Sequence, residues 1–158
     1  MVGKGEIEIW YLGLDGILKR FVGKADRVYF IGRPVYGTEV AIMDREGNVI
    51  ERTGYNSLYI SRKHAMAYVD GKTRLLNVVD HGFDGKGSTY GTYVGKAIKR
   101  PTNLDGTLDT EAIEWILRYG KAEERIPKGG SIYIPIGMGR LVQLGEKPYG
   151  FRTFICYL

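Results

Sequence analysis

The sequence predicts an all-β fold, a β-sandwich of about ten to eleven strands with one short inserted helix. Short runs of alternating polar and apolar residues recur along the 158-residue chain, and they are rich in β-branched and aromatic side chains. Many of the 23 glycines fall between these runs, where the chain has to turn. No repeat of fixed period is present, which argues against a propeller or a solenoid.

The first strand is the clearest, because Glu6-Ile7-Glu8-Ile9 alternates strictly between polar and apolar residues. Asp15-Gly16 then supplies a turn, and later turns fall at residues 44–48 and at Asp70-Gly71. In chain order, we expect strands at residues 6–12, 17–22, 27–31, 39–43, 49–52, 65–69, 74–79, 93–94, 132–136, 140–144 and 151–157.

One segment, residues 109–120, has helical instead of β spacing. Its apolar residues Ile113, Ile116 and Leu117 lie three and four positions apart, as on one face of a helix. Asp109 is a suitable N-cap residue, and Gly120 is a suitable stop. The spacing therefore predicts a short helix within an otherwise β-rich chain.

We expect this helix to cap one open end of the sandwich, inside an insertion at about residues 101–125. The whole chain, residues 1–158, is then a single domain, because its length suits one core and not two. A different role, docking of a partner, requires Trp115 and Tyr119 to face solvent.

Composition narrows the classes of partner. The net charge of +5 is modest and spread along the chain, so a nucleic-acid tail is not expected, whereas an anionic peptide remains compatible. The apolar runs are far shorter than the roughly 20 residues of a membrane-spanning helix, so no membrane partner is expected. The single cysteine, Cys156, excludes an internal disulfide and favours a reducing, cytoplasmic setting.

Three clusters of polar residues lie where predicted strands begin or end. They are Gly32-Arg33, Ser61-Arg62-Lys63-His64, and the segment GSTYGTYV at residues 87–94. Two guanidinium groups, several hydroxyls and glycine-freed backbone N–H groups suit a phosphate dianion, which carries three strong acceptor oxygens. Binding residues often collect on such loops above a rigid scaffold.

In this order the clusters resemble the signature of the forkhead-associated family. The matching segments read YFIGRP, LYISRKHAMAY, LLNVVD, GSTYGTYVG and ERIPKGGSIYIPIG, and they span most of residues 6–157. In the last segment Ser131 replaces the acidic residue of the family pattern. The resemblance implies a forkhead-associated β-sandwich that binds phosphothreonine in protein partners, and hence a role in signalling through phosphopeptide recognition.

The resemblance also implies a role for each matching residue. Ser61 and Arg62 match phosphate contacts, and Arg33 matches an arginine that contacts the phosphate or supports the loop beside it. Thr89 matches the loop residue whose hydroxyl or backbone N–H reaches the phosphate. Tyr90 takes the adjacent peptide-contacting position. Gly32, His64, Gly91 and Thr92 match residues that support the site, with His64 packed inward to tie the binding loops together.

Tyr90 is the main departure from the family pattern, which has asparagine there. The amide of asparagine donates and accepts hydrogen bonds at once and clamps the ligand's main chain, whereas a phenol offers one hydroxyl in another place. The other departures are a longer loop at residues 44–57 and the insertion at residues 100–125. Either could select the ligand or cover an edge strand.

No enzymatic activity, cofactor or metal is expected. An extended segment would point Ser61 and His64 to opposite faces, and no carboxylate is assigned to orient the histidine. The run from Asp80 to Gly85 resembles the start of a calcium loop, but glycines occupy two places where ligands are required. With two histidines and one cysteine, a zinc site is also disfavoured.

Two other hypotheses remain open. The chain is either a sandwich that lost its ligand and serves as a structural or self-associating interaction domain, as Tyr90 and the insertions suggest, or a nucleic-acid binder. The second alternative rests on the charge and the 12 tyrosines, and the lack of a clustered basic stripe makes it the weakest.

Overall fold

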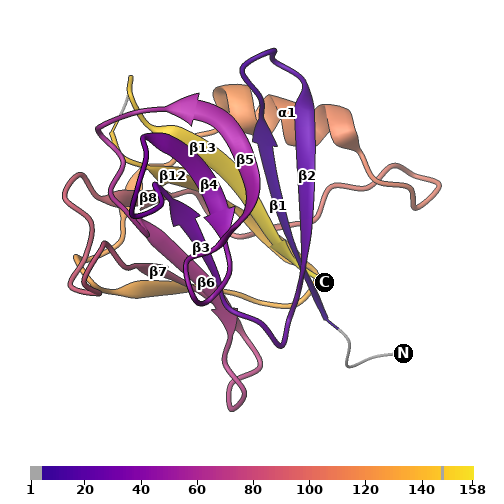
Figure 1. Ribbon diagram of the computed structural model, residues 1–158. Coiled ribbons are helices and arrows are strands. Elements are labelled where there is room, and N and C mark those ends of the chain that lie inside the picture. Colours follow the sequence, from indigo (N-terminus) through magenta and orange to yellow (C-terminus); the bar gives the residue numbers. More distant parts are fainter. Residues whose placement is uncertain (1–4, 147) are drawn as a thin grey trace.

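The computed structural model describes residues 5–146 and 148–158, and within these residues two antiparallel sheets pack face to face (Figure 1). The predicted all-β sandwich with one short helix is therefore confirmed. The first sheet, sheet A, has seven strands, of which six follow the order β10-β8-β12-β13-β1-β2, while β9 pairs with β12. The second sheet, sheet B, has the order β11-β7-β6-β3-β4-β5.

The strands of sheet A are β1 (Glu6–Leu12), β2 (Leu18–Lys24), β8 (Thr92–Val94), β9 (Ile98–Lys99), β10 (Glu124–Arg125), β12 (Met138–Leu144) and β13 (Phe151–Tyr157). Those of sheet B are β3 (Tyr29–Gly32), β4 (Glu39–Met43), β5 (Val49–Asn56), β6 (Ala65–Val69), β7 (Leu76–Asp80) and β11 (Ser131–Ile134). The helix is α1 (Thr110–Tyr119).

These thirteen strands exceed the ten to eleven expected. The two that the sequence pattern missed are β9 and β10, and each has only two residues, all exposed. Because such strands bury no side chain, they leave no alternation of polar and apolar residues to detect.

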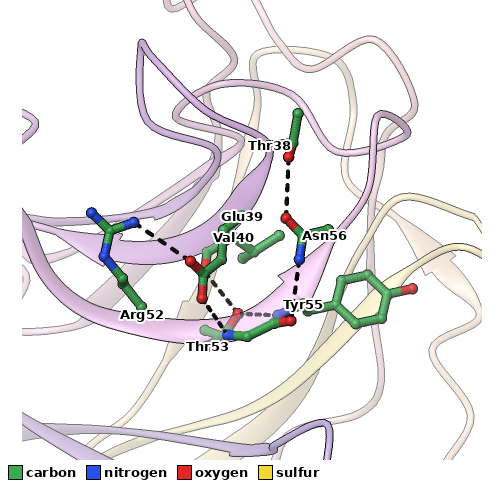
Figure 2. Close-up of polar contacts among 8 residues, drawn as sticks. Thr38, Glu39, Val40, Arg52, Thr53, Tyr55 and Asn56 are labelled. Carbon is green, nitrogen blue, oxygen red and sulfur yellow. Dashed lines mark hydrogen bonds and ion pairs between the residues drawn. The ribbon is translucent and has the colours of Figure 1, made fainter.

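The predicted long loop at residues 44–57 is also wrong, because most of it is strand β5. A turn at residues 44–48 precedes the strand. Towards its C-terminal end, β5 bulges at Gly54, whose φ of +82° lies in the left-handed region. Glu39 accepts a hydrogen bond from the backbone N–H of Gly54 (2.8 Å), and the Thr53 hydroxyl donates to the carbonyl of Val40 (2.7 Å; Figure 2).

The main core lies between the two sheets. In β1, Ile7, Ile9 and Tyr11 point into it, while Glu8 and Trp10 point to the outer face of sheet A. That outer face is buried as well, since Trp10, Phe154 and Cys156 form a second apolar cluster with the helix. Strands β1 and β13 are therefore covered on both faces.

Helix α1 provides this cover. It lies across the outer face of sheet A (Figure 1) and buries Ile113 and Leu117 there, so the expectation that it caps an open end of the sandwich is wrong. Asp109 caps its first turn, accepting a hydrogen bond from the N–H of Ala112 (3.0 Å). At the other end, the guanidinium of Arg152 in β13 donates to the carbonyls of Leu117, Ile116 and Gly120.

A buried acid also joins the insertion to sheet A. Glu8 is fully buried, and its carboxylate accepts two hydrogen bonds from the Arg100 guanidinium (2.8 Å each) and one from the Trp10 indole (3.1 Å), with Arg20 as a further ion-pair partner. Burial raises the pKa of Glu8, but the bonds from Arg100 and Trp10 and the charges of both arginines outweigh it, so the pKa lies below its ordinary value.

No helix in the described part of the chain is long and apolar enough to cross a membrane.

We expect Ile113→Ala to lower the free energy of unfolding by about 2–4 kcal/mol, because it opens a cavity between α1 and sheet A. Trp115→Ala, on the opposite face of the same helix, should change it by no more than about 0.5 kcal/mol, since that side chain is 61% exposed. Urea unfolding followed by circular dichroism measures both. Equal effects of the two variants would contradict the packing of Ile113 against sheet A.

Candidate anion-binding site

Four connections meet at one end of sheet B and enclose a basic hollow of about 590 Å³. They follow β3, precede β6, follow β7 and precede β11, and these strands lie side by side in the sheet. The hollow is lined by Arg33, Ser61, Arg62, Phe83, Asp84, Lys86, Gly87, Thr89 and Lys128. The four residues matched to phosphate contacts therefore share one hollow, whereas Tyr90 does not line it.

Backbone pairing holds the two arginines side by side. Arg33 and Arg62 form an isolated parallel β-bridge, in which the Arg33 N–H donates to the Ser61 carbonyl (3.2 Å) and the Lys63 N–H donates to the Arg33 carbonyl (3.1 Å). Gly32 allows this approach, because a Cβ at that position would lie 2.5 Å from the backbone nitrogen of His64. The bridge therefore fixes the backbone positions from which both arginine side chains extend.

Neither arginine forms an ion pair with a carboxylate among the described residues. The Nε–H of Arg33 donates a hydrogen bond to the carbonyl of Ile60 (2.6 Å), which leaves its terminal nitrogens free. The guanidinium of Arg62 lies over the ring of Phe83 (5.8 Å to the ring centroid). Burial and the charge of Arg62 lower the pKa of Arg33 from its ordinary value. The hollow is thus lined by four basic side chains and one acid, Asp84.

The Ser61 hydroxyl is positioned with its hydrogen free. Its oxygen accepts a hydrogen bond from the backbone N–H of Thr89 (3.0 Å). A hydroxyl that accepts in this way can still donate its own hydrogen to a ligand oxygen. Since the N–H of Thr89 is already used, Thr89 offers its exposed hydroxyl to the hollow rather than its backbone.

His64 is fully buried and joins two of the loops. Its Nδ1 accepts from the Ser61 N–H (3.0 Å), so Nε2 carries the hydrogen and donates to the Gly91 carbonyl (2.7 Å). The segment is not extended as expected, because Lys63 adopts a φ of +46° and turns the chain. Both ring nitrogens are occupied by backbone groups, and neither is available to activate the Ser61 hydroxyl.

Asp80 is a supporting residue that sequence reasoning did not include in the site. Its buried carboxylate accepts hydrogen bonds from the hydroxyls of Ser88 (2.6 Å) and Thr92 (2.7 Å) and from the backbone N–H groups of Ser88 and Gly129. Ser88 in turn accepts from the Gly91 N–H (2.9 Å). The sequence signal for Asp80 is a carboxylate at the end of a buried strand, because a buried charge requires hydrogen-bond partners.

Lys86 and Lys128 were also missed, because they come from loops far apart in sequence. Gly87 brings them together: its φ of +112° turns the loop, and a Cβ there would collide with the side chain of Lys128. The backbone of Lys86 lies against Gly129, one residue beyond Lys128. Both lysine side chains are exposed.

Tyr90 belongs to a row of three exposed tyrosines beside the hollow. Its ring meets Tyr59 edge to face (5.3 Å between centroids), and Tyr59 stacks on Tyr149 (4.6 Å). Tyr55, which follows the β5 bulge (Figure 2), fixes Tyr149 by donating its hydroxyl hydrogen to the Tyr149 carbonyl (3.1 Å). The residue that replaces the expected asparagine is thus held by aromatic packing.

No protein-family model matches the chain, and no curated protein matches it either. Within the described ranges, no three His, Cys, Asp or Glu side chains are grouped so that they could hold a metal ion.

Burial holds the pKa of His64 at about 4, despite the opposing effects of the Gly91 carbonyl and the charge of Asp80. In the unfolded chain the pKa is about 6.5, so the unfolded state binds more protons between these values, and stability falls as pH falls. We expect a loss of about 3 kcal/mol between pH of about 6.5 and 4 from this group.

Urea unfolding at several pH values in that range measures the loss. In the upper half of the range, ordinary carboxyl groups do not yet titrate, so the change in stability there reports on the histidine. NMR of the His81→Gln variant, which leaves one imidazole, gives the pKa directly. A ring signal that titrates near 6.5 in the folded protein would contradict the buried, neutral histidine.

Proposed function

We propose that the chain is a phosphopeptide-binding module that recognises phosphothreonine in protein partners, and that it is not an enzyme. The observation that carries the proposal is the pair Arg33 and Arg62, which a backbone bridge holds side by side and which form no ion pair with a carboxylate among the described residues. The two guanidinium groups repel each other, and an anionic ligand between them would relieve this repulsion.

The groups free to bind match the chemistry of a phosphate. The terminal nitrogens of Arg33 and the guanidinium of Arg62 can each donate to phosphate oxygens, and charge-assisted bonds of this kind are among the stronger ones in proteins. The hydroxyls of Ser61 and Thr89 add uncharged donors that also suit the bridging oxygen of a phosphoester.

The threonine preference and the forkhead-associated family remain part of the proposal and rest on the motif resemblance. The same resemblance supports a cytoplasmic signalling role for the single domain. The hydrogen bonds of His64 support a purely structural part for that residue, because both ring nitrogens are engaged with the backbone. This favours binding over catalysis at Ser61.

We expect the protein to bind phosphothreonine peptides from a library and not their unphosphorylated twins. Arg33→Ala and Arg62→Ala should each weaken this binding at least tenfold, since each removes charge-assisted hydrogen bonds of about 1.5–3 kcal/mol. Fluorescence anisotropy measures the affinities. Arg45→Ala, in the turn before β5 and outside the hollow, is the matched control and should leave them unchanged.

Binding that ignores the phosphate, or that survives both hollow variants, would refute the proposal. The alternative of a self-associating domain without a ligand would then gain weight, because Trp115 and Tyr119 are 61% and 65% exposed on α1 and pack on each other (5.7 Å). Assembly that Trp115→Ala abolishes in light scattering would support this alternative.

Tyr90→Asn should tighten phosphopeptide binding by roughly five- to tenfold, because an amide at this position can hold the peptide main chain with two hydrogen bonds. Tyr90→Phe removes only the phenol hydroxyl and should have little effect. Isothermal titration calorimetry with one phosphothreonine peptide compares the three proteins. Weaker binding by both variants would instead mean that the Tyr90 hydroxyl contacts the ligand.

A further inference from the structure

A hairpin ahead of α1 presents a leucine to solvent. It is formed by residues 102–108 and closed by an isolated bridge between Thr102 and Leu108. Leu104, near its tip, is fully exposed, so this side chain is not packed against the rest of the chain. In Figure 1 the hairpin, which leads into α1, projects beyond the helix and away from both sheets.

Hydrogen bonds hold the hairpin in one shape. The N–H of Asn103 donates to the Thr107 carbonyl (2.7 Å), and the Asn103 amide donates to the Thr107 hydroxyl (3.0 Å). At the base, the Asp109 N–H donates to the Pro101 carbonyl (3.1 Å), which joins the hairpin to the start of α1. Leu104 is thus carried by an ordered turn, and its burial by a partner requires little further ordering of the backbone.

An apolar pocket of about 630 Å³ opens at the other end of α1. Its apolar lining comes from one helix and four strands and consists of Val94, Ile98, Ile116, Leu141 and Phe154. A volume in this range holds small ligands and is ample for one leucine side chain. The last turn of α1 forms one wall, and it lies about 15 Å along the helix from the base of the hairpin.

The charges of the hairpin and of the pocket are complementary. Asp105 follows Leu104 on the hairpin, and its carboxylate is exposed. At the pocket, both acidic side chains already pair with bases, whereas Lys96 forms no ion pair among the described residues. An apolar tip with a negative charge beside it therefore matches an apolar pocket with an unpaired positive charge at its edge.

We propose that the hairpin of one copy of this chain docks into the pocket of another, with Leu104 among the apolar residues and Asp105 beside Lys96. Hairpin and pocket are different surfaces, so the contact is head-to-tail, and such contacts build rings or open chains instead of closed two-fold dimers. Neither surface includes the basic hollow. The inference is therefore independent of phosphopeptide binding, and an assembly places several hollows in one particle.

The contact is small, so we expect weak, reversible assembly with a Kd between about 10 µM and 1 mM. Sedimentation velocity across these concentrations measures it. Leu104→Ser should weaken assembly by about tenfold or more, because it removes the apolar side chain that the contact buries. Leu14→Ser removes another exposed leucine, in the turn between β1 and β2, and as the matched control it should leave assembly unchanged.

A mixing experiment tests the head-to-tail geometry. The pocket variant combines Lys96→Glu with Ile98→Glu at two exposed positions, so that the altered pocket repels Asp105 while the fold is kept, as circular dichroism checks. This variant and Leu104→Ser should each stay monomeric. Their equimolar mixture should form one-to-one dimers, because one protein keeps the hairpin and the other keeps the pocket.

Assembly that survives Leu104→Ser, a mixture that stays monomeric, or an unaltered protein that is monomeric up to about 1 mM would overturn this inference. So would assembly that Trp115→Ala abolishes and Leu104→Ser leaves intact, because the contact would then lie on the exposed face of α1. Leu104→Ser should bind phosphothreonine peptides with the affinity of the unaltered monomer, so that either proposal can fail while the other stands.

Discussion

At the end of sheet B that carries the basic hollow, the position of the loops depends on the buried carboxylate of Asp80. From it a continuous series of hydrogen bonds runs through the Ser88 hydroxyl, the backbone of Gly91 and the imidazole of His64 to the N–H of Ser61. Each member is buried or half-buried, so a break would leave a polar group without a partner at a cost of about 1–3 kcal/mol. The hydrogen bonds of buried and half-buried groups thus position the loops.

Backbone hydrogen bonds offset the repulsion between Arg33 and Arg62. Two unit charges 4 Å apart in water repel by about 1 kcal/mol, and the exposed position of Arg62 keeps the repulsion near this limit. Against it stand the two backbone bonds of the Arg33–Arg62 bridge and the bond from Arg33 to Ile60, each of about 1 kcal/mol. Folding therefore holds the charges together, and an anion between them turns repulsion into attraction.

Strict alternation was enough to predict the sandwich, and the cap and spacing around Ile113 were enough to predict the helix. The predicted position of the helix was wrong, because the pattern was taken to show one buried face only. The runs Trp10-Tyr11-Leu12 and Phe154-Ile155-Cys156 are apolar on both faces, and this is the signal of a third layer.

The same distinction holds for the site. Arg33, Ser61 and Arg62 could be found because they lie next to glycine or histidine in recognisable short motifs. Lys86 and Lys128 could not, because their proximity depends on how two loops fold around Gly87 and Asp80. Residues that lie in one short motif could be predicted from the sequence, whereas contacts between distant loops could not.

The packing of α1 on sheet A affects which parts of the molecule unfold locally. Arg152 reaches from β13 to three carbonyls at the end of the helix, and Glu8 in β1 holds Arg100 at the start of the insertion. The helix thereby adds a third layer over β1 and β13, which are covered on both faces, while Arg20 and Val22 of β2 stay exposed. We expect β1 and β13 to have the most slowly exchanging backbone amides, and local openings to begin at the edges of sheet B; hydrogen exchange measures both.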